Sequence, residues 1–177
     1  MKNYSISIPL SGEVYRLAKE CQKKIYGAIS IKSTWIHNAE PHLNLISGTT
    51  NDIDNIIKSV KKFKFEHGKY CDLLGIGVLI TPNPLIHMRF TSSLFLKEFR
   101  LNLFNETLQF WDSLTNTVND DMWMPKSTLA FKDFTLNDLT KALIPLKDMK
   151  FQLRMEISEI SIIDFTEHEH EVRRVAI

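Results

Sequence analysis

The sequence predicts an α+β fold with two lobes, in which two mostly antiparallel sheets face a central cleft and helices lie on the outside. Two observations support this prediction. Strand-like alternation and helical stripes of apolar residues take turns along the chain. A short pattern also occurs twice, and each copy is followed by a polar turn, an amphipathic helix and an apolar strand. A chain that repeats one unit tends to pair the two copies about an approximate two-fold axis.

The first half of the chain begins with a strand and a helix. Residues 4–8 alternate between exposed and buried types, as a half-buried strand does. Ser11 is placed to cap a helix whose apolar stripe runs to Ile25. The further elements expected here are a short strand at 28–31, a strand at 42–47, a turn at 48–52, a helix at 53–60, and a hairpin of strands at 73–80 and 85–91.

The second half follows the same order after a connecting helix. Ser92 or Ser93 is placed to cap a long helix that extends roughly to Ser113. The later elements expected are a loop at 116–121, a strand at 126–131, a capped helix at 135–146, a strand at 157–165, a turn at 166–169 and a closing strand at 172–177. We therefore expect one domain over residues 1–177, with one motif per lobe at 41–45 and 125–129.

The repeated pattern is Pro, a large basic residue, any residue, a small polar residue and Leu. It occurs as Pro41-His42-Leu43-Asn44-Leu45 and, 84 positions later, as Pro125-Lys126-Ser127-Thr128-Leu129. Residues i and i+2 of a strand share a face, so His42 lies beside Asn44 and Lys126 beside Thr128. An imidazole, an amide, an ammonium and a hydroxyl that meet across a cleft suit a tetrahedral oxyanion such as phosphate. The alternative is an ordinary polar face on a half-exposed strand.

Composition narrows the classes of function. The chain has 177 residues, of which 44% are hydrophobic and 24% charged, as expected of a soluble globular protein. Its formal net charge of +1 argues against coating long nucleic acid, but a local pocket for one or two phosphates is compatible with it. No apolar run approaches the roughly 18 residues of a membrane span, and no signal peptide is visible. We expect cytoplasmic localisation, no membrane partner, and buried thiols at Cys21 and Cys71.

Four further residues are candidates for lining the cleft. His87 and Arg89 share a face of the strand at 85–91, where Arg89 could clamp a phosphate and His87 could supply a second imidazole. A solvated strand face is the alternative for both. Trp35 and Trp123 come shortly before the two motifs and could stack on a base. Packing in the core or at the rim is the alternative for both tryptophans.

One segment has a composition that suggests a metal. Glu167-His168-Glu169-His170-Glu171 contains five residues of ligand type, but it falls in a hairpin turn with no other ligand cluster in the sequence. We therefore expect neither a metal nor another cofactor.

The two motifs and their setting resemble the 2H phosphoesterases, also called the 2′-5′ RNA ligase-like or cyclic phosphodiesterase superfamily. Members of that superfamily carry two His-x-Thr/Ser motifs, one in each lobe of a bilobal α+β fold. Pro41-His42-Leu43-Asn44-Leu45 resembles the first motif. Trp123-Met124-Pro125-Lys126-Ser127-Thr128-Leu129-Ala130 resembles the second, whose usual form is Trp-x-Pro-His-x-Thr-Leu-Ala. The resemblance in element order covers nearly the whole chain.

This resemblance implies chemistry without a metal, in which one His is the general base and the other the general acid on a 2′-phosphoester or cyclic phosphate. By position, His42 matches the first His and Thr128 the second hydroxyl. Asn44 stands where Thr or Ser is usual, and Lys126 stands where the second His is usual. An unperturbed Lys titrates near ~10.4, and loss of a matched acid or base typically lowers a rate by ~10²–10⁴. The substitution moves the site from turnover towards binding.

Three functions are compatible with the sequence. The first is a protein that binds a small nucleotide, a cyclic nucleotide or an RNA terminus and sequesters it with little or no hydrolysis. The second is an active 2′,3′-cyclic phosphodiesterase or 2′-5′ phosphoesterase, with His42 as acid or base and Lys126 as an electrostatic stabiliser. The third is a non-catalytic scaffold that works through a protein surface. The sequence leaves the ligand and the oligomeric state open.

Overall fold

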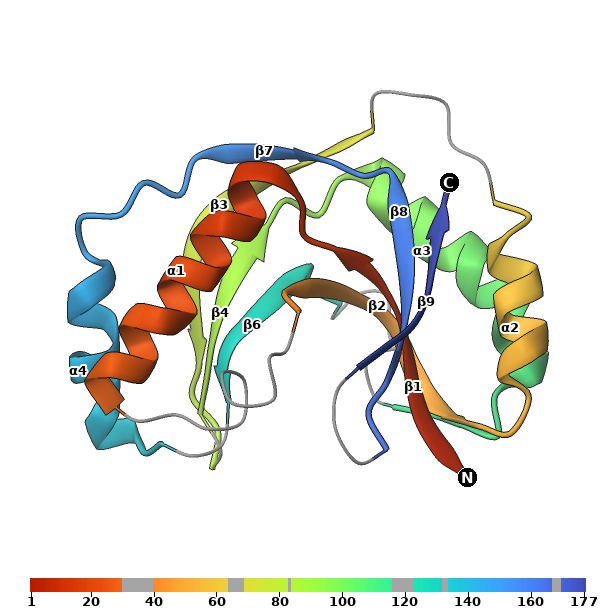
Figure 1. Ribbon diagram of the computed structural model, residues 1–177, viewed down its shortest axis with the longest axis horizontal. Coiled ribbons are helices and arrows are strands. Elements are labelled where there is room, and N and C mark those ends of the chain that lie inside the picture. Colours follow the sequence, from red (N-terminus) through yellow and green to blue (C-terminus); the bar gives the residue numbers. More distant parts are fainter. Residues whose placement is uncertain (30–39, 64–68, 83, 116–122, 132–133, 167–169) are drawn as a thin grey trace.

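The computed structural model describes residues 1–29, 40–63, 69–82, 84–115, 123–131, 134–166 and 170–177 (Figure 1). It contains two antiparallel sheets and flanking helices, so the predicted α+β class is confirmed. In Figure 1, α1 and α4 lie on one side of the molecule and α2 and α3 on the other. Within the described residues, no helix is long and apolar enough to cross a membrane.

The first sheet has five strands in the order β5-β2-β1-β8-β9, and the second has four in the order β6-β4-β3-β7. The strands of the first sheet are β1 (Lys2–Pro9), β2 (His42–Thr50), β5 (Ser113–Leu114), β8 (Glu159–Asp164) and β9 (His170–Ala176). Those of the second are β3 (Tyr70–Leu79), β4 (Leu85–Phe90), β6 (Lys126–Phe131) and β7 (Leu153–Glu156). The first motif therefore begins one strand of the first sheet, and the second motif begins an edge strand of the second sheet.

Helices flank the two sheets (Figure 1). They are α1 (Gly12–Ile29), α2 (Ile53–Val60), α3 (Leu94–Thr107) and α4 (Leu139–Leu143), with short 3₁₀ turns η1 (Leu108–Phe110), η3 (Leu136–Asp138) and η4 (Ile144–Leu146). The Ser93 hydroxyl accepts a hydrogen bond from the Leu96 amide at the start of α3. Thr135 and Asp138 form a capping box before α4, as the sequence predicts.

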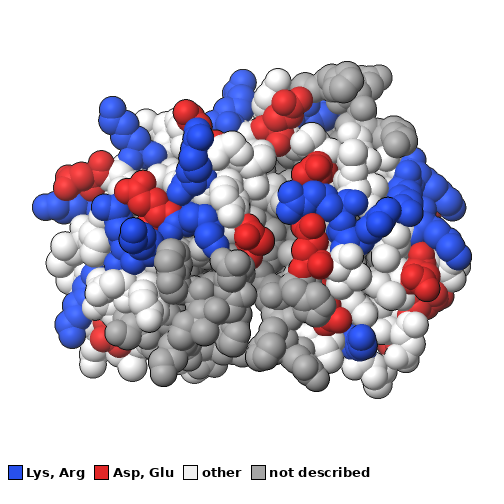
Figure 2. Space-filling model, viewed as in Figure 1, with Lys and Arg blue, Asp and Glu red and all other residues white. Residues whose placement is uncertain are grey.

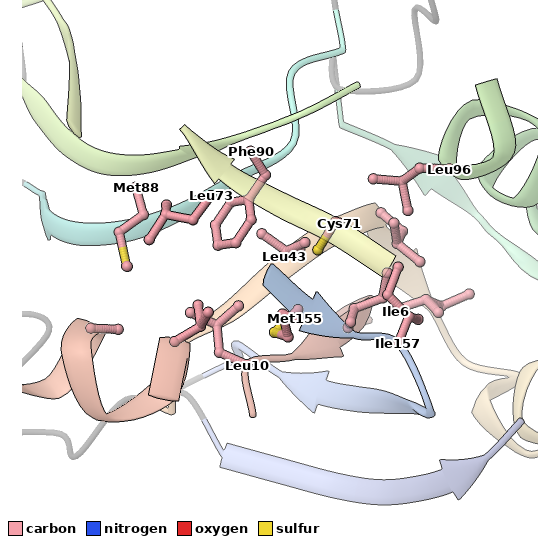
Figure 3. Close-up of a cluster of buried hydrophobic side chains, with 14 of the residues drawn as sticks. Ile6, Leu10, Leu43, Cys71, Leu73, Met88, Phe90, Leu96, Met155 and Ile157 are labelled. Carbon is pink, nitrogen blue, oxygen red and sulfur yellow. The ribbon is translucent and has the colours of Figure 1, made fainter. Parts of the chain in front are cut away.

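One hydrophobic cluster joins the two sheets (Figure 3). Ile6 and Leu43 enter it from the first sheet, and Leu73, Met88 and Phe90 from the second. All five are buried, because their strands turn one apolar face inward. The two motif strands therefore pack against one continuous hydrophobic core.

The cysteines are buried, as expected from the sequence, and the described part of the surface seen in Figure 2 has no large area of one charge. Cys21 and Cys71 are buried free thiols, and burial raises the pKa of each to about 12. On the face seen in Figure 2, basic and acidic side chains are interspersed. Any attraction for phosphate must therefore come from a local group of cations rather than from this face as a whole.

Two predictions about element ends are wrong. Ala28 and Ile29, expected in a short strand, continue α1, and the rest of that segment lies outside the described residues. The expected turn at 48–52 begins late, because Gly48–Thr50 extend β2 and pair with β1, and Gly48 and Thr49 also pair with β5. Gly48 permits this close approach, since a Cβ there would collide with the carbonyl oxygen of Ser113. Pairing between distant segments overrides the local turn signal here.

Two short strands, β5 and β7, are not predicted from the sequence. The helix expected to reach Ser113 ends at Thr107, and Ser113–Leu114 form β5 beside β2. The strand expected at 157–165 is preceded by β7, which pairs with β3 in the other sheet. Strands of two to four residues are too short to show a period, so only their partners reveal them. The loop expected at 116–121 and most of the turn at 166–169 lie outside the described residues.

Candidate functional site

His42 lies at the start of β2, opposite Pro9 of β1, and is partly exposed. Its Nδ1 is 2.8 Å from the carbonyl oxygen of Glu40. Because a carbonyl can only accept, the neutral ring carries its proton on Nδ1 and its lone pair on Nε2. The ring also faces Phe165, with 5.9 Å between the ring centroids. The backbone and Phe165 thus orient the imidazole, and the lone pair of its neutral form lies on Nε2.

Asn44 is the second polar residue of this motif and pairs with Ser7 of β1. Its Oδ1 is buried and has no hydrogen-bond partner among the described residues. Asn44 borders a cavity of about 270 Å³, whose other lining residues are Asn3, Tyr4, Ser47, Gly48, Thr115 and Phe165. An unpaired buried amide oxygen is unfavourable, and only a group that donates a hydrogen bond, such as a hydroxyl or a water molecule, can relieve this.

Lys126 and Thr128 occupy the matching positions on β6. Both are partly exposed. Ser127, which lies between them, and Leu129, which follows them, are buried. Burial lowers the pKa of Lys126 below its ordinary value. The alternation predicted for this motif is therefore present, with two polar side chains on the open face of the strand.

The two motifs have the same irregularity in strand pairing. The register of β1 with β2 shifts between Ile6 and Ser7, and that of β4 with β6 shifts between Ile86 and His87. In each motif strand the extra residue is the motif leucine, Leu45 or Leu129. A bulge lets this leucine and the next residue both turn into the core, and it bends the strand just after the polar pair.

Two buried side chains, Trp123 and Arg100, connect the two motif strands, which lie in contact with each other. We call this pair of residues the strut. Trp123 comes just before β6 and is 9% exposed, and its Nε1 donates to the carbonyl oxygen of Asn44 at 3.2 Å. Arg100 of α3 is 1% exposed, and its Nε donates to the carbonyl oxygen of Leu45 at 2.8 Å. Its guanidinium lies 5.0 Å from the Trp123 ring. These contacts satisfy two carbonyls at the bulge and hold the motifs in a set relation.

His87 pairs with Thr128 and is only 2% exposed, so the alternative of a solvated strand face does not hold for it. Its ring covers Gly77 of β3, where a Cβ would fall 2.7 Å from Nε2. Its Nδ1 lies 3.4 Å from the carbonyl oxygen of Met88. Burial lowers the pKa of His87 below 6.5; the Met88 contact opposes this, and the charge of Lys126 adds to the lowering. The ring is therefore neutral at pH 7.

Arg89 pairs with Lys126 and is exposed. Residues directly opposite on neighbouring strands point to the same side, so two cations stand next to each other. Within the described part of the chain, no carboxylate forms an ion pair with either of them. Like charges placed opposite each other are unfavourable unless an anion joins them. The pairing thus places two positive charges beside the second motif.

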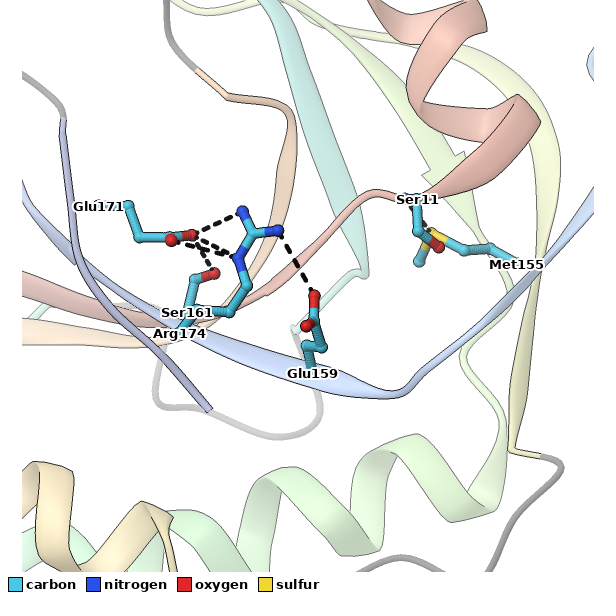
Figure 4. Close-up of polar contacts among 6 residues, drawn as sticks. All are labelled: Ser11, Met155, Glu159, Ser161, Glu171 and Arg174. Carbon is cyan, nitrogen blue, oxygen red and sulfur yellow. Dashed lines mark hydrogen bonds and ion pairs between the residues drawn. The ribbon is translucent and has the colours of Figure 1, made fainter. Parts of the chain in front are cut away.

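The first sheet provides a contrast. Arg174 of β9 donates from Nη2 to Glu171 Oε2 at 2.8 Å and lies 3.4 Å from Glu159 Oε2 (Figure 4). Ser161 donates to the same Glu171 oxygen at 2.6 Å. This cation is therefore neutralised within the protein, whereas Arg89 and Lys126 lack such acidic partners among the described residues.

The two tryptophans proposed from the sequence to stack on a base differ in what the structure describes of them. Trp123 is buried in the strut, as the packing alternative expects, and Trp35 lies outside the described residues. Sequence reasoning missed Arg100 and Phe165. A basic residue in the buried stripe of α3 is a signal for Arg100, but nothing local points to Phe165. Among the described residues no group of three His, Cys, Asp or Glu could hold a metal, and residues 167–169 lie outside that set.

Comparison with solved structures identifies the fold. A Thermus thermophilus protein, TT0787, superposes with a TM-score of 0.71 at 13% identity, covering 98% of this chain and 97% of that one. Escherichia coli LigT complexed with 3′-AMP superposes with a TM-score of 0.64 at 12% identity, covering 99% and 98%. Kluyveromyces marxianus Usb1 superposes with a TM-score of 0.55 at 8% identity, covering 99% of this chain and 98% of that one.

No protein-family model matches the chain, and no curated protein matches it in sequence. The likeness is therefore one of fold, extending over nearly the full length of each of these proteins. LigT is a 2H phosphoesterase, so the fold that the two motifs led us to expect is present. This chain has the two-sheet α+β fold of the 2H phosphoesterases.

Proposed function

We propose that this protein is a 2H phosphoesterase-like protein that binds a small nucleotide, a cyclic nucleotide or an RNA terminus through its phosphate. The phosphate lies between β2 and β6 and is hydrolysed slowly or not at all. His42 and Lys126 flank it, and Asn44 and Thr128 donate hydrogen bonds to its oxygens. Neither a metal nor another cofactor takes part.

The observation that carries this proposal is the uncompensated charge of Lys126. Lys126 is half-buried, it stands opposite Arg89, and no carboxylate of the described residues pairs with it. A partly desolvated cation without a partner is unfavourable, so an anionic ligand completes the site.

Lys126 also favours binding over turnover. In the neutral ring His42 has the lone pair that a general base needs, but the matching position of the second motif holds an ammonium where the superfamily has an imidazole. Burial lowers the pKa of Lys126, which moves it towards an acid, but a bound phosphate anion moves it back. The ammonium therefore stays protonated and attracts phosphate without supplying a matched proton donor.

The solved relatives in fold support a nucleotide. Structures of E. coli LigT have been determined in complexes with 3′-AMP, NADP⁺, ATP and phosphate. All four contain phosphate, and three contain adenosine. We take adenosine phosphates as the first probes for this chain for that reason.

Calorimetry tests the proposal. We expect 3′-AMP to bind and adenosine to bind far more weakly, because only the first carries the anion. Lys126→Gln should weaken 3′-AMP binding by roughly tenfold to a hundredfold, the effect of losing a hydrogen bond to a charged group. Lys147→Gln, which removes an exposed lysine at the end of η4, is the matched control and should bind like wild type. Equal binding of adenosine and 3′-AMP would refute a phosphate site.

Slow hydrolysis is the second candidate, favoured by the orientation of His42 alone. If the protein is an active phosphodiesterase, 2′,3′-cyclic AMP should be converted to a monoester, and His42→Ala should abolish the conversion. Lys126→His should then raise the rate, because it restores a well-matched acid or base. Intact nucleotide recovered after prolonged incubation with wild type would support binding without turnover.

A further inference from the structure

We infer that the site selects a doubly charged terminal phosphate, as in a phosphomonoester, over a singly charged cyclic or internal phosphodiester. This inference rests on the proposed function and adds the class of phosphate. It comes from the pairing of Arg89 with Lys126 on the open face of the second sheet.

The register brings the two cations together. His87 pairs with Thr128, Met88 with Ser127 and Arg89 with Lys126, without irregularity over these three pairs. Met88 and Ser127 are buried, so the pairs on either side of them point to the opposite face, where Arg89 is exposed, Lys126 and Thr128 are partly exposed and His87 is buried. Arg89 and Lys126 therefore extend from the same side of the sheet, at the motif end of β6.

The surroundings leave this charge uncompensated. Neither cation forms an ion pair with a described carboxylate, in contrast to Arg174 with Glu171 and Glu159. On β3, Gly75 pairs with Arg89 and Gly77 with His87, so the β3 positions directly opposite these two residues have no side chain. His87 is buried and remains neutral, and so adds no third charge. The open face thus presents two positive charges.

Two positive charges match a phosphomonoester better than a diester. A monoester carries about −1.5 to −2 charge at pH 7 and offers three terminal oxygens, whereas a diester carries a single charge. The guanidinium of Arg89 can bind two of these oxygens at once, and the ammonium of Lys126 can bind the third. A cyclic phosphate exposes only two unesterified oxygens, so it cannot satisfy both cations equally well.

Calorimetry with 3′-AMP and 2′,3′-cyclic AMP measures this preference, because the two ligands share base and sugar. We expect wild type to bind 3′-AMP at least about tenfold more tightly. Arg89→Gln should remove most of that preference by weakening 3′-AMP and leaving the cyclic ligand nearly unchanged. Arg173→Gln removes an exposed arginine from β9 of the other sheet and should leave both affinities as in wild type. Chromatography of the recovered ligands verifies that the cyclic probe is intact.

A pH series gives an independent readout. The second ionisation of a phosphomonoester lies near pH ~6, and a cyclic diester has no such ionisation. The ratio of 3′-AMP affinity to cyclic AMP affinity should therefore rise between pH 5 and pH 7.5 in wild type. In Arg89→Gln the ratio should rise much less, because one of the two cations that recognise the second charge is gone.

The outcomes separate the inference from the proposed function. If both ligands bind equally well, or if Arg89→Gln weakens both by the same factor, the selection for a dianion is wrong and the phosphate site stands. If neither ligand binds wild type, the proposed function fails, and this inference fails with it. A tenfold preference that collapses only in Arg89→Gln supports both.

Discussion

The contact between His87 and Gly77 makes a strong prediction about stability. A Cβ at Gly77 would fall 2.7 Å from Nε2 and 3.2 Å from Nδ1 of the ring, both well inside van der Waals contact. The ring is 2% exposed, so it cannot swing into solvent without opening the sheet. Gly77→Ala should therefore destabilise the wild-type protein by about 1–3 kcal/mol, the usual effect of overpacking a filled site.

The sign should reverse when the ring is removed. Gly77 does not have a positive φ, so alanine is compatible with its backbone. In a His87→Ala background, Gly77→Ala should stabilise by roughly 0.4–1 kcal/mol, because it restricts the unfolded chain. The double-mutant cycle should thus give a coupling energy on the order of 2 kcal/mol.

Urea denaturation followed by circular dichroism measures all four free energies of unfolding. Gly27→Ala in α1 is the matched control, because a Cβ there meets nothing within 4 Å. It should have the same small stabilising effect in both backgrounds. Equal effects of Gly77→Ala with and without His87 would refute the placement of the ring over β3.

Two further predictions concern the strut and the buried imidazole. Trp123→Phe removes the hydrogen bond to the Asn44 carbonyl and should lower the free energy of unfolding by about 1–2 kcal/mol, with weaker 3′-AMP binding measured by calorimetry. His87 has a pKa below 6.5 in the folded state, so the unfolded chain binds more protons as the pH falls through 6.5. Wild type should therefore lose stability from pH 7 to pH 5, and His87→Gln should lose less over the same range in urea titrations.

Each of these predictions has a contradicting result. Trp123→Phe with unchanged nucleotide affinity would mean that the strut does not set the relation of the two motifs. Identical pH slopes for wild type and His87→Gln would mean that the imidazole titrates in the folded state as it does in the unfolded chain.

The motif strands could be predicted from the sequence because their signal is local. At 42–45 and 126–129, polar and apolar residues alternate within a few positions, and this alone decides which side chains turn outward. The same holds for the caps at Ser93 and Thr135, whose side chains bond within three residues. Such contacts can be predicted without knowing how the rest of the chain folds.

The partners of those strands could not be predicted in this way. The sequence does not say that Lys126 stands opposite Arg89, that His87 covers Gly77, or that Arg100 caps the carbonyl at the Leu45 bulge. These contacts join residues between 10 and 55 positions apart, and their geometry depends on register. A shift of strand register by one residue would have turned Lys126, Arg89 and His87 to the other face of the sheet.

The sequence by itself determined the class of fold and the two strands that carry His42, Asn44, Lys126 and Thr128. Those features follow from residue types and short-range periodicity. Only the tertiary structure decided that a second cation stands beside Lys126 and that His87 is buried and neutral. The physical reason is that charge balance and burial depend on which strands pair and in what register.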